Sequence, residues 1–377
     1  MSKKEEVTQV KDDPDLLELM LEDNKSAPLL FQPTNLWKRY ENMFLPELQS
    51  LGLHDFRRRK NSIVSSFGAT DETRASIFVK VLYKGRGSTK RRIIHVIIRN
   101  MLKNKKLSSL IAYIAKGYSG ISQNDLDLLS FEYAKSYGIE HESKPISEFS
   151  GSLIGNPDNV FYVENKIYTI DLLNYYIKYA HCSKFIDFSS INSIAEIGSG
   201  SGKQTEVIKR LYPDINFYIF DIPPQIYVAE QYLSALFPDS VVSYRETRKL
   251  KQIPENEKGK IYIFEPQHLA QIQNLKYDFF FNASSFQEME PEVVTNYLKY
   301  VNEQTKKYVF ISGSTEGKEI APKPGKHGVL KPTTLEHYKN GLKDFELTNI
   351  SKRVKVPDPT KVKTGAFMFW NKKSITN

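Results

Sequence analysis

Short apolar runs alternate with amphipathic segments through the second half of the chain. Each run is short enough for a buried strand, and the segments between the runs repeat apolar residues at helical spacing. Strands that alternate with helices in this way predict a mostly parallel sheet covered by helices. The predicted strands are 193–197, 215–220, a weak 241–244, 260–264, 277–282, 307–312, 345–350 and 365–370, and the predicted helices are 203–212, 225–236, 291–304 and 334–342.

The N-terminal part of the chain has a different pattern. Trp37, Tyr40, Phe44 and Leu48 recur at steps of three and four residues, which predicts one apolar stripe on a helix. We therefore predict three parts: a flexible acidic tail at 1–35 that holds at most one short helix near 16–21, a basic helical domain at 36–150, and a sheet domain at 151–377. Further helices are expected at 73–84, 91–106, 107–115, 122–138 and 171–179, and a hairpin at 160–169 that turns at Glu164 and Asn165.

Charge is unevenly distributed along the chain. The net charge is +9 over 377 residues, but residues 36–120 hold 18 Lys and Arg against 5 Asp and Glu, a net charge of +13. A basic region of this kind favours an anionic partner, such as a phosphate-bearing small molecule, a phosphorylated glycan, a membrane surface or nucleic acid. A solvated basic surface without a partner explains the same composition equally well.

The remaining composition narrows the class of protein. A single cysteine, Cys182, excludes a disulfide framework and any cysteine-based zinc site, and no His, Asp and Glu cluster has the spacing of metal ligands. The first residues lack the apolar segment of a signal peptide, and no apolar run is long enough to span a membrane. We expect a soluble cytoplasmic protein with no metal ligands identifiable from the sequence; a requirement for a divalent cation stays open, and a homo-oligomer is compatible with the sequence.

A glycine-rich turn follows the first strand of the sheet domain. The strand at 193–197 contains Glu196 and runs into Gly198, Gly200 and Gly202, and the next strand ends at Asp221. Glycine at every second position removes side chains from the turn, so that a ligand can lie against the backbone. A strand, a glycine turn, a helix and a second strand together form one βαβ unit for binding a nucleotide-like ligand.

The spacing separates three kinds of ligand. A dinucleotide site needs a further glycine where the chain has Lys203, and a phosphate-binding P-loop needs glycine at Ile197 and Ser or Thr at Gln204. The pattern that remains resembles the S-adenosylmethionine (SAM) site of class I methyltransferases. That resemblance implies a Rossmann-like, mostly parallel seven-stranded sheet, closed by the antiparallel pair at 345–350 and 365–370.

Residues of this site are expected at the carboxyl ends of the strands. The resemblance implies that Glu196 brings negative charge near the cofactor and that the Asp221 carboxylate accepts hydrogen bonds from both ribose hydroxyls. Gln267 and His268 follow the third main strand, where enzymes of this class contact adenine. The full set of cofactor-binding candidates is Glu196, Gly198, Ser199, Gly200, Gly202, Asp221, Ile222, Gln267, His268, Asn282 and Ser284.

Two longer motifs resemble the family of sugar O-methyltransferases. They are Asp-Ile-Pro-Pro, which begins at Asp221, and Ser-Phe-Gln-Glu-Met, which ends at Met289. The likeness covers residues 36–310 and implies SAM-dependent methylation of a sugar hydroxyl, on a nucleotide-sugar, a polysaccharide or a glycosylated natural product. The acceptor is expected to be anionic, with the helical N-terminal domain covering its site.

A sugar hydroxyl is a poor nucleophile, so a positioned base is expected to help. Glu288 is the first candidate because it follows the fourth strand, although an acid there also suits the start of the next helix. His268 and His327 are the other candidates. His327 lies on a loop rich in Gly and Pro that could cover the acceptor, or could be only a connector.

Two other functions remain open from the sequence. The basic N-terminal region is compatible with an RNA methyltransferase. Against that reading, the segment after the fourth strand is Asn-Ala-Ser-Ser-Phe rather than the Pro-Pro type that holds the amine of a base, so nucleic acid is the less favoured partner. A non-catalytic interaction module that keeps the fold is the third reading.

Overall fold

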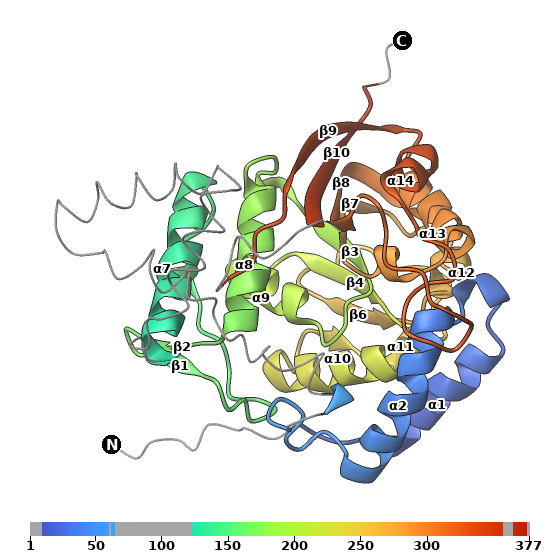
Figure 1. Ribbon diagram of the computed structural model, residues 1–377, viewed down its shortest axis with the longest axis horizontal. Helices are drawn as coiled ribbons and strands as arrows, with labels where there is room; N and C mark the ends of the chain where they lie inside the picture. The colour runs from blue at the N-terminus through green and yellow to red at the C-terminus, as the bar shows by residue number, and fades with distance from the viewer. Residues whose placement is uncertain (1–9, 60–61, 65–122, 357–364, 375–377) are drawn as a thin grey trace.

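A mixed eight-stranded sheet lies at the centre of the computed structural model, which describes residues 10–59, 62–64, 123–356 and 365–374 (Figure 1). Its strand order is β5-β6-β4-β3-β7-β8-β10-β9. The strand bounds are β3 (Ser193–Ile197), β4 (Asn216–Phe220), β5 (Val241–Val242), β6 (Ile261–Phe264), β7 (Tyr277–Ala283), β8 (Thr305–Ser314), β9 (Phe345–Lys352) and β10 (Gly365–Lys372).

The sheet has the connectivity of the class I methyltransferase fold. In the spatial order of the sheet, the six strands β5, β6, β4, β3, β7 and β8 are parallel to one another. Strand β3 lies between β4 and β7, and β10 runs antiparallel between β8 and β9. This is the fold predicted from the sequence, and each of the eight strands predicted along the chain has a counterpart in the sheet. The family resemblance implies seven strands; the eighth is the weak strand predicted at 241–244, which forms the two-residue β5 and pairs with β6 at the edge of the sheet.

Helices cover both faces of the sheet (Figure 1). Successive strand residues face opposite sides, so that Ile194 belongs to the core on one face and Ala195 to the core on the other. The first face is covered by α8 (Ile170–Ser183), α9 (Lys203–Leu211) and α10 (Pro223–Leu236), and the second by α12 (His268–Gln271), α13 (Pro291–Gln304) and α14 (Leu335–Gly341). The short helix α11 (Tyr244–Thr247) contacts β6.

The described part of the predicted acidic tail is folded rather than flexible. Residues Pro14–Lys25 form helix α1, which Asp13 caps by accepting a hydrogen bond from the Leu16 amide at 3.1 Å. Leu16, Leu17 and Met20 are buried in the core, and α1 packs on α10 and α11. The segment folds because its apolar residues form one stripe that packs on the core, although its high charge favours disorder. One of its acids, Asp23, forms an ion pair with Arg248.

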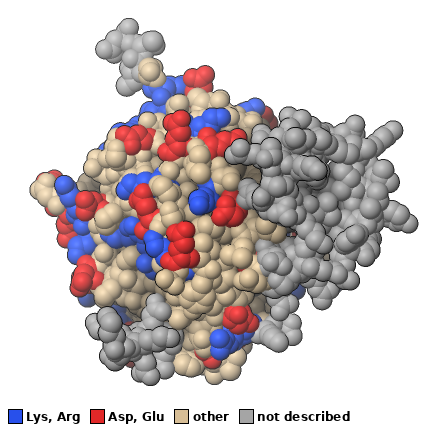
Figure 2. Space-filling view, turned by 90° about the vertical axis from the view of Figure 1, so that its left-hand side faces the viewer, with Lys and Arg blue, Asp and Glu red and all other residues tan. Residues whose placement is uncertain are grey.

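The described part of residues 36–150 packs onto the sheet domain. Helix α2 (Asn35–Leu51) contacts α10, and α7 (Gln123–Glu140) contacts α8. The helices predicted at 73–84, 91–106 and 107–115, and much of the basic excess with them, lie outside the described residues. On the face in Figure 2, basic and acidic side chains are interspersed among the coloured residues.

One arginine of the basic cluster at 57–60 is structural. Only 3% of Arg57 is exposed, and its Nη1 donates hydrogen bonds to the carbonyls of Ser152 and Ile154, both at 3.1 Å. These bonds tie the segment after α2 to the sheet domain. Since a buried guanidinium with backbone partners cannot contact an external phosphate, Arg57 is not part of a solvated basic surface.

The hairpin predicted at 160–169 is confirmed. The hairpin forms from β1 (Phe161–Val163) and β2 (Lys166–Tyr168), with Glu164 and Asn165 at positive φ in the turn. Cys182 is buried and free. Within the described ranges, no helix is both long enough and apolar enough to span a membrane. Single-turn 3₁₀ helices are η1 (Leu29–Phe31), η2 (Ile146–Glu148), η3 (Phe188–Ser190) and η4 (Phe286–Glu288).

Candidate functional site

The glycine turn and Asp221 meet at one edge of the sheet. Ile197 at the end of β3 lies opposite Phe220 at the end of β4, so the residues that follow each strand emerge side by side. The Gly200 amide donates a hydrogen bond to Asp221 Oδ2 at 2.7 Å, and the Ile222 amide donates one to Oδ1 at 2.8 Å. The Asp221 carboxylate thus holds the glycine turn in place through hydrogen bonds to a charged acceptor.

The three glycines of the turn meet different surroundings. All have positive φ, which favours glycine. A Cβ on Gly198 would lie 2.2 Å from Ser285 Oγ, and one on Gly202 would lie 2.7 Å from Leu233 Cδ1, whereas a Cβ on Gly200 would meet no atom within 4 Å. Gly198 and Gly202 are therefore required for packing, and Gly200 faces open space.

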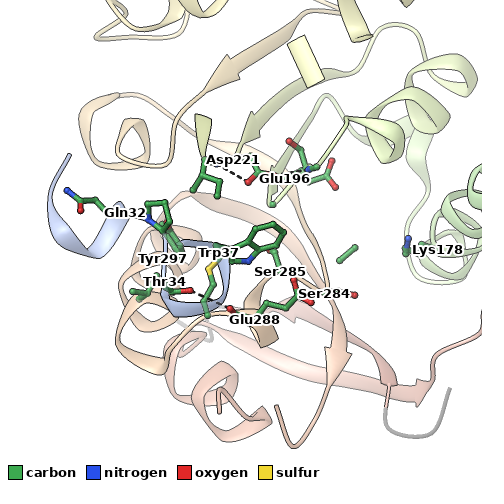
Figure 3. Close-up of a pocket in the computed structure, with 18 of the residues that line it drawn as sticks. Gln32, Thr34, Trp37, Lys178, Glu196, Asp221, Ser284, Ser285, Glu288 and Tyr297 are labelled. Carbon is green, nitrogen blue, oxygen red and sulfur yellow. Dashed lines mark hydrogen bonds between the residues drawn. The ribbon is translucent and has the colours of Figure 1, made fainter. Parts of the chain in front are cut away.

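That open space is a cleft with about 910 Å³ of volume, its open mouth included. Its walls come from the glycine turn, the ends of β4 and β7, helices α8 and α13, and the segment that precedes and begins α2 (Figure 3). The lining residues are Gln32, Pro33, Thr34, Trp37, Tyr175, Lys178, Glu196, Gly198, Ser199, Gly200, Asp221, Ile222, Ala283, Ser284, Ser285, Glu288, Met289, Val293 and Tyr297.

Two carboxyl groups in the cleft, the buried Glu196 and the half-buried Asp221, have raised pKa values. Burial raises the pKa of Glu196 to about 8, against the opposing effect of the Lys178 ammonium. Burial also raises the pKa of Asp221 to about 7, although the Gly200 and Ile222 amides favour its charged form. A ligand that brings positive charge or hydrogen-bond donors stabilises both carboxylates, so the cleft suits such a ligand.

Glu196→Gln is expected to stabilise the ligand-free protein at alkaline pH. The folded-state pKa of Glu196, about 8, lies above the ordinary carboxyl value, so ionisation opposes folding more and more as pH rises from about 4.3 to 8. Glutamine does not ionise and escapes this cost. The thermal midpoint of the variant should exceed that of the wild type by roughly 3 °C or more at pH 8.5, with a smaller difference at pH 5.

Thermal unfolding at pH 5, 7 and 8.5 measures this effect. The exposed Glu292, replaced by glutamine, serves as the matched control and should shift the midpoint by the same small amount at each pH. A wild-type protein that gains stability over the Glu196→Gln variant as pH rises would contradict the prediction.

The structure brings eight of the predicted residues together around the cleft. They are Glu196, Gly198, Ser199, Gly200, Asp221, Ile222, Ser284 and Glu288. Two predicted residues support the cleft without lining it. Gly202 is the N-cap residue of α9, and the buried Asn282 donates hydrogen bonds from Nδ2 to the Ile197 carbonyl at 2.8 Å and to Ser285 Oγ at 2.6 Å.

Gln267 and His268 lie outside the cleft lining. Both are buried, and Gln267 Nε2 donates a hydrogen bond to Glu265 Oε2 at 2.6 Å. The His268 ring packs against Tyr244 and Phe264, and burial lowers its pKa. These contacts place both side chains in the protein interior, in contrast to the adenine-contacting position predicted for them.

His327 lies on the loop between β8 and α14 and is also absent from the lining. Its Nε2 is 2.9 Å from Glu319 Oε1, and its Nδ1 is 3.5 Å from the Tyr40 hydroxyl. The side chain is 47% exposed. Among the three predicted bases, the cleft therefore contains Glu288, whose carboxylate forms an ion pair with Lys318 at 2.6 Å.

Several lining residues were missed because their positions depend on long-range packing. Thr34 and Trp37 come from the N-terminal segment, and Thr34 Oγ1 donates a hydrogen bond to the Glu288 carbonyl at 3.4 Å (Figure 3). The next residue, Asn35, binds the loop that carries His327: its Nδ2 donates to the Gly328 carbonyl at 2.9 Å, and its Oδ1 accepts from the Gly325 amide at 2.7 Å. No local pattern in the sequence indicates these contacts.

Comparisons with known proteins agree with this description. Residues 174–258, which include the glycine turn and Asp221, match the family model of an O-methyltransferase domain. A search of curated proteins finds no match.

Solved structures with a partial likeness were also found. The pyocyanin biosynthetic protein PhzM is 15% identical, with a TM-score of 0.36, over 54% of this chain and 57% of that one. The mitomycin 7-O-methyltransferase MmcR is 8% identical, with a TM-score of 0.34, over 67% and 74%. Magnesium protoporphyrin IX methyltransferase from Synechocystis PCC 6803, with bound SAH, is 13% identical, with a TM-score of 0.32, over 48% and 73%. These likenesses carry no information about the acceptor of this chain.

Proposed function

We propose that this chain is an O-methyltransferase that binds SAM in the cleft and transfers its methyl group to a hydroxyl of a sugar. The observation that carries the proposal is the hydrogen bond from the Gly200 amide to Asp221, which joins the glycine-rich turn to a carboxylate at the cleft. The family match to an O-methyltransferase domain supports the same reaction.

The cleft residues fit this cofactor. Asp221 presents a carboxylate to which two ribose hydroxyls can donate, and Glu196 adds negative charge that favours a cation. Ser199 Oγ is buried without a hydrogen-bond partner among the described residues and is available to a polar ligand. When bound, SAM supplies a methyl group activated by its attachment to a sulfonium.

The protein's own contribution to the reaction is alignment and proton removal. Glu288 lines the cleft and can take the proton of an acceptor hydroxyl, while the ion pair with Lys318 orients its carboxylate. Trp37, Met289 and Tyr297 add apolar surface to the walls, which helps to exclude water and to fix the acceptor in line with the methyl group. The assignment of a sugar as the acceptor rests on the family resemblance of the motifs at Asp221 and Met289, which both adjoin the cleft.

Calorimetric titration with SAM, followed by methyl-transfer assays, tests the proposal. We expect SAM to bind and the methyl group to be transferred to at least one compound from a panel of free sugars, sugar phosphates and nucleotide-sugars. A panel of phenols and a structured RNA are assayed as alternative methyl acceptors. Transfer only to the phenols or to the RNA would reject the sugar, and failure to bind SAM would reject the enzyme.

Glu288→Gln is expected to lower kcat by about 100-fold and to leave the Kd for SAM within about threefold. Glutamine keeps the size of the side chain but cannot accept the hydroxyl proton. Single-turnover methyl transfer and SAM titration measure the two quantities separately.

The matched control for this variant is Glu336→Gln, which removes an exposed acid that also pairs with a lysine, Lys339. Its kcat should match that of the wild type. Full turnover by the Glu288→Gln variant would remove this residue from the mechanism.

A further inference from the structure

Cationic side chains gather where α8 approaches the residues after β9. Lys178 on α8 lines the cleft, and Figure 3 places it at the opposite end of the drawn residues from Gln32. Its Nζ lies 3.9 Å from the centre of the Tyr175 ring. In the described ranges, no carboxylate forms an ion pair with Lys178, although Glu196 acts on it electrostatically.

Arg353, directly after β9, reaches a residue of the cleft lining. Its Nη1 donates a hydrogen bond to Ser284 Oγ at 3.0 Å, and Ser284 lines the cleft. Its Nε is buried and has no hydrogen-bond partner among the described residues. Ser284 itself has a positive φ of 78°, an uncommon conformation for a residue other than glycine.

Cations and carboxylates both act on the Lys178 amine. Burial lowers its pKa to about 7, the positive charges of Arg353 and Lys355 add to that effect, and the carboxylates of Glu196 and Asp171 oppose it. Burial also lowers the pKa of Arg353, against the attraction of Glu288. Lys178 and Arg353 are both half-buried, and partial burial of cations is costly unless anions accompany them. An ammonium in the cleft lining and an arginine N–H without a partner, on a side chain bonded to the lining residue Ser284, are groups that recognise a carboxylate or a phosphate.

We propose that Lys178 and Arg353 form a binding site for the carboxylate or phosphate group of a ligand in the cleft. The proposal rests on the proposed function only for the source of that anion. One source is the α-carboxylate of the cofactor, and the other is an acid group on the sugar acceptor.

Binding measurements with defined probes separate the two sources. The cofactor arm compares S-adenosylhomocysteine (SAH) with 5′-deoxy-5′-methylthioadenosine, which has the nucleoside and the thioether but no amino-acid group. The acceptor arm uses glucuronate and glucose 1-phosphate, titrated with and without SAH. Each probe is measured against the wild type, Arg353→Gln and Lys178→Gln.

In the cofactor arm, both variants should bind SAH at least about tenfold more weakly and methylthioadenosine unchanged if the cofactor supplies the anion. If the acceptor supplies it, both variants should bind SAH unchanged and lose at least about tenfold in affinity for glucuronate or glucose 1-phosphate. Either result supports the site. The proposal is overturned if neither variant weakens any anionic probe, or if methylthioadenosine loses as much affinity as SAH.

Controls keep the test independent of folding and of the reaction. Lys352→Gln removes an exposed cation adjacent to Arg353 in the sequence and should leave every affinity unchanged. Arg353→Lys keeps the charge without the planar fork and should recover part of the lost affinity. If Arg353→Gln does not fold, Lys178→Gln provides the same comparison. A wild type that binds neither SAH nor methylthioadenosine rejects the proposed function, while the acceptor arm without SAH still tests the anion site.

Discussion

Asp221→Ala is expected to weaken SAM binding by at least about 100-fold. The carboxylate can accept hydrogen bonds from two ribose hydroxyls, and each hydrogen bond to a charged group contributes about 1.5–3 kcal/mol. It also accepts the Gly200 amide at 2.7 Å, so its removal releases the turn against which the cofactor would lie. Because burial raises the pKa of Asp221, the ionised carboxylate opposes folding, and the variant is expected to remain folded.

Calorimetric titration of SAM and SAH at pH 8 measures this loss. Asp221→Asn retains one carbonyl oxygen and should lose about tenfold, between the wild type and the alanine variant. Asp239→Ala, which removes an exposed acid in the loop after α10, should bind as the wild type does. An alanine variant at position 221 that binds SAM within threefold of the wild type would contradict the ribose assignment.

Gly200→Ala is expected to abolish measurable SAM binding while the protein stays folded. A Cβ at this position would meet no protein atom within 4 Å, so the methyl group would project into the cleft where the cofactor is proposed to lie. The cost to folding comes from the φ of +55°, and should be of order 1 kcal/mol. Thermal unfolding and SAM titration measure the two effects separately.

Gly325 provides the matched control. Its φ is +79° and a Cβ there would also meet nothing within 4 Å, but it lies outside the cleft lining. Gly325→Ala should therefore show a similar loss of stability and normal SAM binding. Gly198→Ala should instead lower the stability of the fold more than Gly200→Ala does, because its Cβ would collide with Ser285 Oγ. Normal SAM binding by Gly200→Ala would exclude the turn from the cofactor site.

The sheet and its glycine turn were predictable from local sequence. The strand at 193–197 and the helix at 291–304 have the predicted bounds. These elements have strong periodicity and clear ends, such as Pro291 at the first position of α13. The pairing of the turn with Asp221 was also predictable, because consecutive strands of one βαβ unit place their carboxyl ends together.

The walls of the cleft were less predictable. The periodicity around Trp37 predicts a helix with an apolar stripe, but it contains no information about the surface on which that helix docks. Lys178 lies within an aromatic-rich helix, where its role depends on Arg353, which is far away in the chain. For His268, local sequence suggested a ligand contact because the residue follows a strand. Tertiary packing around Phe264 buries its side chain instead.

The fastening of Asn35 to the loop at 325–328 has a practical consequence for work with this protein. A shortened version that starts at the sheet domain would retain the glycine turn and Asp221 but would lack Thr34 and Trp37, and with them one side of the ligand chamber. The sheet domain and the N-terminal segment thus form the walls of the cleft together. Fusions, deletions and domain exchanges should keep both on one polypeptide.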